Sequence, residues 1–250
     1  MPEDCTPSTN SEYGKTEYWD NRFDKEEAYE WLGGYERFKH LIKPHLKSTD
    51  KILVIGAGNS SLPLDLYKDG INHIVALDIS SVLVSKMTKR LSEAKIDSIR
   101  YQQGDMLDLP HKDGEFDCVI EKATLDVLFV ENDSPWEPLP RVQSDMHTTL
   151  HGIHRVLKPD GVFISVTFAQ PHFRKRFLRD GRYSWGCSVE TYGGGEGGSS
   201  FEYFVYVMKK GAREELDEGG GDGLAVERGV DVDYVQEHVE TEDFLTHMEL

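Results

Sequence analysis

The sequence has little cysteine and no long apolar run. Its cysteines, Cys5, Cys118 and Cys187, lie far apart in the chain. An odd number without a spacing motif argues against a disulfide framework and against a cysteine zinc site, and it indicates a reducing compartment. No apolar run approaches the roughly 20 residues that span a membrane, and the polar, acidic N-terminus is unlike a signal peptide. We therefore expect a cytoplasmic protein without a membrane partner, and we expect it to be a monomer.

Basic residues are also scarce. Lys and Arg number 28 against 45 Asp and Glu, which gives a net charge of −17. Residues 211–250 hold 13 acidic and 2 basic residues, so this stretch carries −11 and the rest of the chain −6. Without a basic stripe we expect no direct contact with nucleic acid, and a basic protein partner suits the charge better. We expect residues 211–250 to be an acidic linker and tail, either solvated or steering such a partner.

The N-terminal part of the chain divides into two segments of different composition. Residues 1–12 are rich in Pro, Ser, Thr and acidic residues, which predicts disorder. Residues 13–50 are dense in Tyr, Trp and Phe. We expect this second segment to form an aromatic helical lid over a site, and the alternative is simple packing of an amphipathic helix on the core.

The body of the chain, residues 51–210, alternates between two hydrophobic patterns. Buried strands are predicted at 51–56, 73–78, 98–105, 115–121 and 162–168. Helices are predicted at 59–70, 80–94 and 141–157, with Ser80 as an N-cap and a turn at 158–161. Such alternation means right-handed βαβ units and a parallel sheet.

The end of the body follows a different pattern. Two strand-like segments, 183–192 and 201–208, flank the glycine-rich loop 193–200. They predict an antiparallel pair at one edge of the sheet. The fold class is therefore α/β, a seven-stranded and mostly parallel Rossmann-like sheet with an antiparallel edge hairpin and helices on both faces.

Distinctive residues follow the first three strands, where ligands bind in an open parallel sheet. Gly56 and Gly58 allow a tight turn and close approach of a ligand. The third glycine of a dinucleotide fingerprint is replaced by Ser61, which makes NAD less favoured. Asp78 could accept hydrogen bonds from ribose hydroxyls, or it could merely cap the next helix.

Two further residues follow the third strand, at Asp105 and Met106. The carboxylate of Asp105 could meet an adenine amino group, and Met106 could pack on the ring. The pair is weak evidence alone and gains weight beside the other strand ends.

Charged residues also end the fourth strand, within the stretch FDCVIEKATLDVLF (116–129). Glu121 and Lys122 stand in line with the other ligand-contacting strand ends, and Asp126 follows shortly after. One interpretation makes them part of a binding site. The other makes this a solvated strand end, with Lys122 reaching to water and pairing with Asp126.

Three histidines share one face of the predicted helix 141–157. His147, His151 and His154 are spaced by four and three residues, a spacing that metal sites also use. No HExxH motif or cysteine pair accompanies them. We expect solvated or capping histidines and no metal.

Several motifs together resemble a known family. The glycine loop, the acid after the second strand, GD after the third, FDCVI and VLKPDG are similar to class I S-adenosylmethionine-dependent methyltransferases. More specific motifs resemble a eukaryotic branch, the elongation factor 1-alpha lysine methyltransferases (type 4): EYWDNRF, VIGAGNSSL, EKATLD, FISVTFAQPHFR and EDFLTHMEL. The resemblance covers nearly the whole chain except 211–240. It implies S-adenosyl-L-methionine as cofactor, S-adenosyl-L-homocysteine as product, and a lysine of elongation factor 1-alpha as substrate.

The resemblance also implies the cofactor contacts. These are Trp19, Phe23, Trp31, Gly56 with Gly58, Asp78 with Ile79, Asp105 with Met106, and Lys122. The family often has Tyr where this chain has Phe23, so a hydroxyl contact there is lost or replaced. It often has Gly where this chain has Ala123, and the added methyl group could crowd the loop.

A lysine nucleophile must be neutral to attack a methyl group, yet its free pKa is about 10.4. Glu121 and Asp126 are the candidate carboxylates for this step, whereas Lys122, which has no acceptor, is expected to hold a cofactor carboxylate or the loop geometry. The alternatives are a methyltransferase for another protein or a small molecule, and a noncatalytic module that binds a partner. An NAD-dependent oxidoreductase is less favoured still.

Overall fold

The sheet contains seven strands in the order β3-β2-β1-β4-β5-β7-β6. The computed structural model describes residues 6–132, 134, 136–193 and 201–212. The strands are β1 (Lys51–Ile55), β2 (His73–Asp78), β3 (Ile99–Gln103), β4 (Phe116–Lys122), β5 (Leu157–Thr167), β6 (Trp185–Gly193) and β7 (Glu202–Lys210). The expected tail falls outside the described residues from position 213 onward, as does most of the glycine-rich loop.

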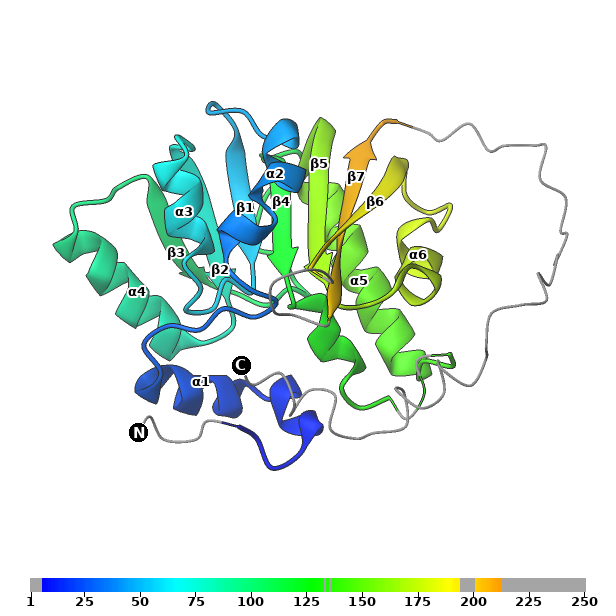
Figure 1. Ribbon diagram of the computed structural model, residues 1–250, viewed down its shortest axis with the longest axis horizontal. Coiled ribbons are helices and arrows are strands. Elements are labelled where there is room, and N and C mark those ends of the chain that lie inside the picture. The colour runs from blue at the N-terminus through cyan, green and yellow to red at the C-terminus, as the bar shows by residue number, and fades with distance from the viewer. Residues whose placement is uncertain (1–5, 133, 135, 194–200, 213–250) are drawn as a thin grey trace, which may run out of the picture.

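Strands β1 to β5 are parallel, and β7 runs antiparallel to both β5 and β6. The predicted fold class, with its antiparallel edge pair, is confirmed. The order reverses between β1 and β4, so the loops beyond β1, β2, β3 and β4 share one edge of the sheet (Figure 1). This is the switch point at which open α/β sheets bind ligands.

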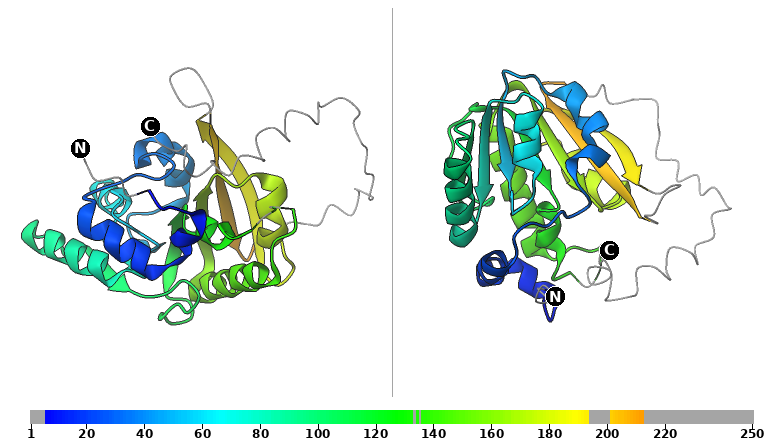
Figure 2. Two further views of the ribbon diagram at one scale, coloured as in Figure 1. Left: turned by 90° about the horizontal axis from the view of Figure 1, so that it is seen from below. Right: turned by 60° about the vertical axis from the view of Figure 1, so that its left-hand side comes forward.

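Both faces of the sheet are covered, and each has its own core. The helices are α1 (Thr16–Lys25), α2 (Lys39–Ile42), α3 (Leu62–Lys68), α4 (Ser81–Glu93), α5 (Pro140–Val156) and α6 (Pro171–Leu178). Residues of α2, α3 and α4 pack on one face with Ile52 and Val54, whereas α5 and α6 pack on the other with Leu53 and Ile55. Figure 2 shows these helices on either side of the sheet. The alternating burial of β1 on two faces explains its continuous apolar run.

The prediction of disorder for residues 1–12 is wrong for the last three of them, residues 10–12. A 3-10 helix, η1 (Asn10–Gly14), begins inside that stretch, although residues 1–5 lie outside the described part. Its Tyr13 is buried, and the ring centroid lies 5.2 Å from that of Tyr18 and 5.8 Å from that of Trp19. Aromatic packing of Tyr13 therefore orders the neighbouring residues 10–12, whose composition alone predicts disorder.

Helix α1 lies across the end of the sheet to which the arrowhead of β4 points (Figure 1). Between α1 and β1 the chain forms only short helices, α2, η2 (Tyr35–Arg37) and η3 (Lys43–His45). Residues 26–34 form no helix. The expected helical lid is thus one regular helix followed by an irregular segment.

Three local features bear on the remaining predictions. Ser80 caps α4 as expected, because its Oγ accepts a 3.1 Å hydrogen bond from the Leu83 amide. The turn expected at 158–161 is instead a bulge within β5, where Asp160 has φ +61°. Helix α6 was missed because its short sequence, with Arg174 buried among basic neighbours, lacks a clear apolar stripe.

Among the described residues, no helix is long and apolar enough to cross a membrane.

Candidate functional site

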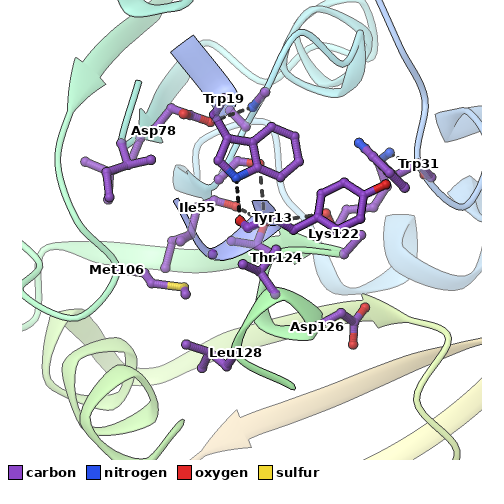
Figure 3. Close-up of a pocket in the computed structure, with 18 of the residues that line it drawn as sticks. Tyr13, Trp19, Trp31, Ile55, Asp78, Met106, Lys122, Thr124, Asp126 and Leu128 are labelled. Carbon is purple, nitrogen blue, oxygen red and sulfur yellow. Dashed lines mark hydrogen bonds between the residues drawn. The ribbon is translucent and has the colours of Figure 1, made fainter. Parts of the chain in front are cut away.

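A pocket of about 330 Å³ lies beyond the carboxyl ends of β1, β2, β3 and β4, within the usual range of roughly 300–1,000 Å³ for ligand sites. The structure brings almost all predicted site residues together here (Figure 3). Those that line the pocket are Trp19, Phe23, Trp31, Gly56, Gly58, Asp78, Ile79, Asp105, Met106, Lys122 and Asp126. Glu121 does not line it.

The glycine turn and Asp78 form one hydrogen-bonded unit. Gly56 and Gly58 have φ of +58° and +54°, and a Cβ on Gly56 would collide with the side chain of Thr124. The Gly58 amide donates to Asp78 Oδ2 at 2.9 Å, and the Ser80 amide donates to Asp78 Oδ1 at 3.0 Å. These amides fix the carboxylate at the pocket wall. Burial raises the pKa of Asp78, and the amide hydrogen bonds oppose that rise.

The acid that follows β3 is also fixed by its own loop. Asp105 Oδ1 accepts a 2.9 Å hydrogen bond from the Leu107 amide. The amide of the preceding Gly104 donates to the Asp78 carbonyl oxygen at 2.9 Å. The loops beyond β2 and β3 are therefore joined, and their acids line the same pocket.

Aromatic side chains of the N-terminal segment cover one side of the pocket. The Trp19 ring stacks on Phe23 with centroids 5.5 Å apart, and its Nε1 donates to the Tyr13 carbonyl at 2.7 Å. Tyr13 and Tyr29 also line the pocket, although neither was predicted as a site residue. The aromatic density of residues 13–50 was the available signal, but it did not single out these two tyrosines.

Lys122 joins β4 to the N-terminal segment, which contradicts the alternative interpretation, in which it reaches water and pairs with Asp126. Its side chain is nearly buried, and Nζ donates to Glu30 Oε2 at 3.1 Å and to the Trp31 carbonyl at 2.6 Å. Burial lowers the pKa of Lys122, and Glu30 opposes this effect. The same Glu30 oxygen accepts from Ser60 Oγ at 2.8 Å. Glu30, which the sequence did not reveal, thus links the lid, the glycine loop and β4.

Glu121 points away from the pocket because adjacent strand residues face opposite sides of a sheet. Its Oε2 accepts from the amides of Thr124 and Leu125 at 3.0 and 3.1 Å, and its Oε1 accepts from Ser165 Oγ. Burial, with the nearby charge of Asp126, raises the pKa of Glu121 to about 7. Its predicted place beside the reacting groups is therefore wrong, and the structure shows it holding the loop that follows β4.

Asp126 does line the pocket, at the start of the 3-10 helix η4 (Leu125–Phe129). Its Oδ1 accepts from Thr167 Oγ1 at 2.6 Å and from Arg174 Nη2. Its Oδ2 is buried and has no hydrogen-bond partner among the described residues. Burial raises the pKa of Asp126, while Arg174 opposes that rise. This is a charged group with one unused acceptor at the pocket wall.

Two of the three α5 histidines make side-chain contacts with the residues before β6, and the third, His151, is exposed. His147 Nδ1 lies 3.1 Å from Tyr183 Oη, and His154 Nε2 lies 3.0 Å from Ser184 Oγ. Both contacts tie α5 to the residues before β6. Within the described part of the chain, no group of three His, Cys, Asp or Glu side chains is arranged to hold a metal ion.

Comparisons with known proteins agree with this geometry. Residues 46–204 match the family model described as a methyltransferase domain. The chain is 36% identical over 208 residues to EEF1A lysine methyltransferase 4 of Bos taurus, covering 82% of this chain and 79% of that protein. It is 32% identical over 216 residues to eEF1A lysine and N-terminal methyltransferase of Xenopus laevis, covering 83% of this chain and 30% of that one.

The structural comparison extends the likeness to distant proteins. A crystal structure of geranyl diphosphate C-methyltransferase from Streptomyces coelicolor A3(2), in complex with Mg²⁺, geranyl diphosphate and S-adenosyl-L-homocysteine, superimposes with a TM-score of 0.53 at 15% identity. The match covers 82% of this chain and 100% of that one. At this identity the likeness concerns the fold alone.

The sheet order, the pocket at its switch point and the matching domain model define a class I S-adenosylmethionine-dependent methyltransferase. Within that class, the chain belongs to the family of EEF1A lysine methyltransferase 4. Its methyl donor is S-adenosyl-L-methionine, and its cofactor product is S-adenosyl-L-homocysteine. The pocket suits this cofactor because it combines a fixed carboxylate, a glycine turn without room for Cβ, aromatic rings and a buried ammonium.

Proposed function

We propose that this enzyme transfers a methyl group from S-adenosylmethionine to a lysine of translation elongation factor 1-alpha. The observation that carries this proposal is the 36% identity to a bovine protein named for that activity, over 79% of its length. The second relative, named for the same target, supports it at 32% identity. The substrate of this chain is thus a protein, encountered in the cytoplasm.

The cofactor is held by the loops beyond the first three strands. Asp78 receives the ribose hydroxyls, and its two amide hydrogen bonds keep the carboxylate oriented before the cofactor arrives. Asp105 meets the adenine amino group, with Met106 and Ile79 packing against the ring. Gly56 and Gly58 let the amino-acid part of the cofactor approach the backbone closely.

The N-terminal segment closes the pocket over the cofactor. Trp19, Phe23 and Trp31 line it from one side, and their apolar rings exclude water from the sulfonium. Trp31 also contributes its carbonyl to Lys122, so lid and strand end are fixed together. Lys122 holds the carboxylate of the cofactor or the geometry of its own loop.

The substrate lysine enters beside Asp126. S-adenosylmethionine supplies an electrophilic methyl group, and the attacking amine must arrive neutral and in line with it. The carboxylate of Asp126, which lines the pocket, attracts the ammonium and orients it before the amine gives up its proton to solvent. Lys122 does not act as a base, because an ammonium has no acceptor. Glu121 acts indirectly, by holding the amides of Thr124 and Leu125.

The test is methyl transfer from isotopically labelled S-adenosylmethionine to purified elongation factor 1-alpha, followed by mass spectrometry of its lysine-containing peptides. We expect label on a lysine, and labelling at least tenfold slower with the Asp126→Asn variant. Label in other lysate proteins but not in elongation factor 1-alpha would favour a different substrate. Thermal stabilisation by S-adenosylhomocysteine without any transfer would favour a noncatalytic binding module.

A further inference from the structure

We propose that Arg174 is a positioning residue for methyl transfer, which fixes the carboxylate of Asp126 at the pocket wall and keeps it ionised. This inference rests on the proposed function, since it assigns a partner to the carboxylate that receives the amine. Arg174 itself does not line the pocket. It acts through Asp126.

The geometry supports a one-sided ion pair. Arg174 Nη2 donates to Asp126 Oδ1, and Thr167 Oγ1 donates to the same oxygen at 2.6 Å. Asp126 Oδ2 and Arg174 Nε, in contrast, have no partners among the described residues. A purely structural arginine–carboxylate pair would be expected to use both oxygens in a bidentate fork. Here one oxygen accepts both hydrogen bonds, whereas the other is buried and finds no partner in the described part of the chain, in a residue that lines the pocket.

The surroundings of Arg174 hold its guanidinium in place. The side chain is 1% exposed, and its Cζ lies 5.1 Å from the centre of the Phe129 ring. Its Nη1 lies 3.8 Å from Met146 Sδ. A planar cation stacked on an aromatic ring keeps one orientation, which a lysine ammonium at the same place would not.

The charges around Asp126 explain why this cation is needed. Burial raises the pKa of Asp126 itself. The charge of Asp126 in turn raises the pKa of two buried neighbours, the Glu121 carboxyl on β4 and the Tyr206 phenol on β7. Arg174 on α6 is the cation paired with Asp126. Without Arg174, a buried carboxylate beside another acid takes up a proton at neutral pH, and a protonated Asp126 cannot attract an ammonium.

The experiment compares pH profiles of kcat/KM for the natural enzyme, Arg174→Met and Arg174→Lys, with elongation factor 1-alpha as substrate. For the natural enzyme, kcat/KM between pH 6 and 8 follows the growing neutral fraction of the substrate lysine, whose free pKa is about 10.4, so log(kcat/KM) rises with a slope of about 1. Glu121 also titrates near pH 7, but it lies outside the pocket lining. In Arg174→Met, Asp126 must also lose a proton, so the slope steepens toward about 2. At pH 7 we expect kcat/KM to fall on the order of tenfold or more, and most of the loss to disappear by pH 9. Arg174→Lys should lie between the two.

Two controls separate positioning from folding. Arg179→Met removes an exposed arginine of the same segment that donates to the Cys187 carbonyl, and it should leave the slope unchanged. In an Asp126→Asn background, Arg174→Met should cause no further loss, whereas a structural role would add its cost to both backgrounds. If Arg174→Met fails to fold, two other measurements test whether Arg174 acts through Asp126. These are the slope of Arg174→Lys and the activity of the double variant Asp126→Asn with Arg174→Met.

The outcomes distinguish this inference from the proposed function. An unchanged slope in a folded Arg174 variant of an active enzyme would overturn the role of Arg174 alone. Absence of any transfer by the natural chain, with cofactor bound, would overturn the proposed function first.

Discussion

Lys122 and Glu30 lie 92 residues apart in the sequence, and their side chains meet at 3.1 Å between Nζ and Oε2. This contact joins the end of β4 to the irregular segment after α1, and Glu30 extends it to Ser60 in the glycine turn. One carboxylate therefore connects three parts of the pocket wall. The wall of the pocket is thus joined through a residue that belongs to none of the strand ends.

Glu30→Gln is expected to weaken S-adenosylhomocysteine binding on the order of tenfold, because it leaves the buried Lys122 ammonium without its counter-charge. Isothermal titration calorimetry measures the change. Glu27→Gln is the matched control, since Glu27 is an exposed acid of the same segment that pairs with Lys86 and Arg90. Equal affinities for the two variants would show that Glu30 has no special part in the cofactor site.

Trp19→Ala is expected to reduce cofactor affinity more than it reduces the melting temperature, because the ring lines the pocket and stacks on Phe23. Calorimetric titration and thermal melting of the same preparation give the two quantities. Trp136→Ala removes an exposed tryptophan outside the pocket lining and should change neither strongly. An unchanged cofactor affinity of Trp19→Ala would show that this ring only packs on the core and takes no part in cofactor binding.

Asp126→Asn and Glu121→Gln are expected to fail in different ways. Asp126→Asn should lower kcat at least tenfold while cofactor affinity stays nearly constant, because it removes the proposed acceptor for the amine. Glu121→Gln should mainly lower stability. Both carboxylate oxygens of Glu121 accept hydrogen bonds, and the amide of Gln keeps only one acceptor oxygen. Steady-state kinetics and thermal melting separate the two effects. Full turnover by Asp126→Asn would remove it from the chemistry.

The raised pKa of Glu121 also predicts a pH dependence of stability. Its folded-state pKa of about 7 lies above the unfolded value of about 4.3, so the folded state binds the proton more tightly. Stability should therefore decline as pH rises from about 4.3 to 7 and then level off. This pH-dependent contribution should be absent in Glu121→Gln, so the difference in melting temperature between the variant and the natural chain should change between about pH 4.3 and 7. A constant difference across that range would contradict the assignment.

His111 predicts a change of the opposite sign. Both its ring nitrogens are buried and have no hydrogen-bond partner in the described part of the chain, and burial lowers the pKa of its imidazole. The folded state therefore disfavours the proton, so stability should fall as pH drops below the unfolded value of about 6.5. His111→Phe, which keeps a ring beside Phe116, should reduce that acid sensitivity. His151→Phe, at an exposed position of α5, should not.

Much of the site followed from strand ends alone. Asp78 and Asp105 were predictable because parallel strands bring their carboxyl ends to one edge. The separation of Glu121 from Lys122 also follows from the alternation of side chains along a strand, because successive residues face opposite sides of the sheet. The sequence analysis nevertheless places both residues in the site. Their neighbouring charges face opposite sides, and only one of them reaches the pocket.

Partners far away in the sequence were not predictable in this way. Glu30 is one acid among many in an acidic chain, and nothing local marks it as the partner of Lys122. Arg174 lies among basic residues, so its burial could not be distinguished from the exposure of its neighbours. Both depend on tertiary packing, as does the 3-10 helix that begins at Asn10, inside the stretch 1–12 whose composition predicts disorder.

The most direct test of the account is a crystal structure of the enzyme with S-adenosylhomocysteine. We predict the ribose hydroxyls within hydrogen-bond distance of Asp78, the adenine beside Asp105 and Met106, and the sulfur near the wall formed by Lys122 and Asp126. A cofactor bound elsewhere, or a pocket whose strand ends make no contact with it, would contradict the central claim.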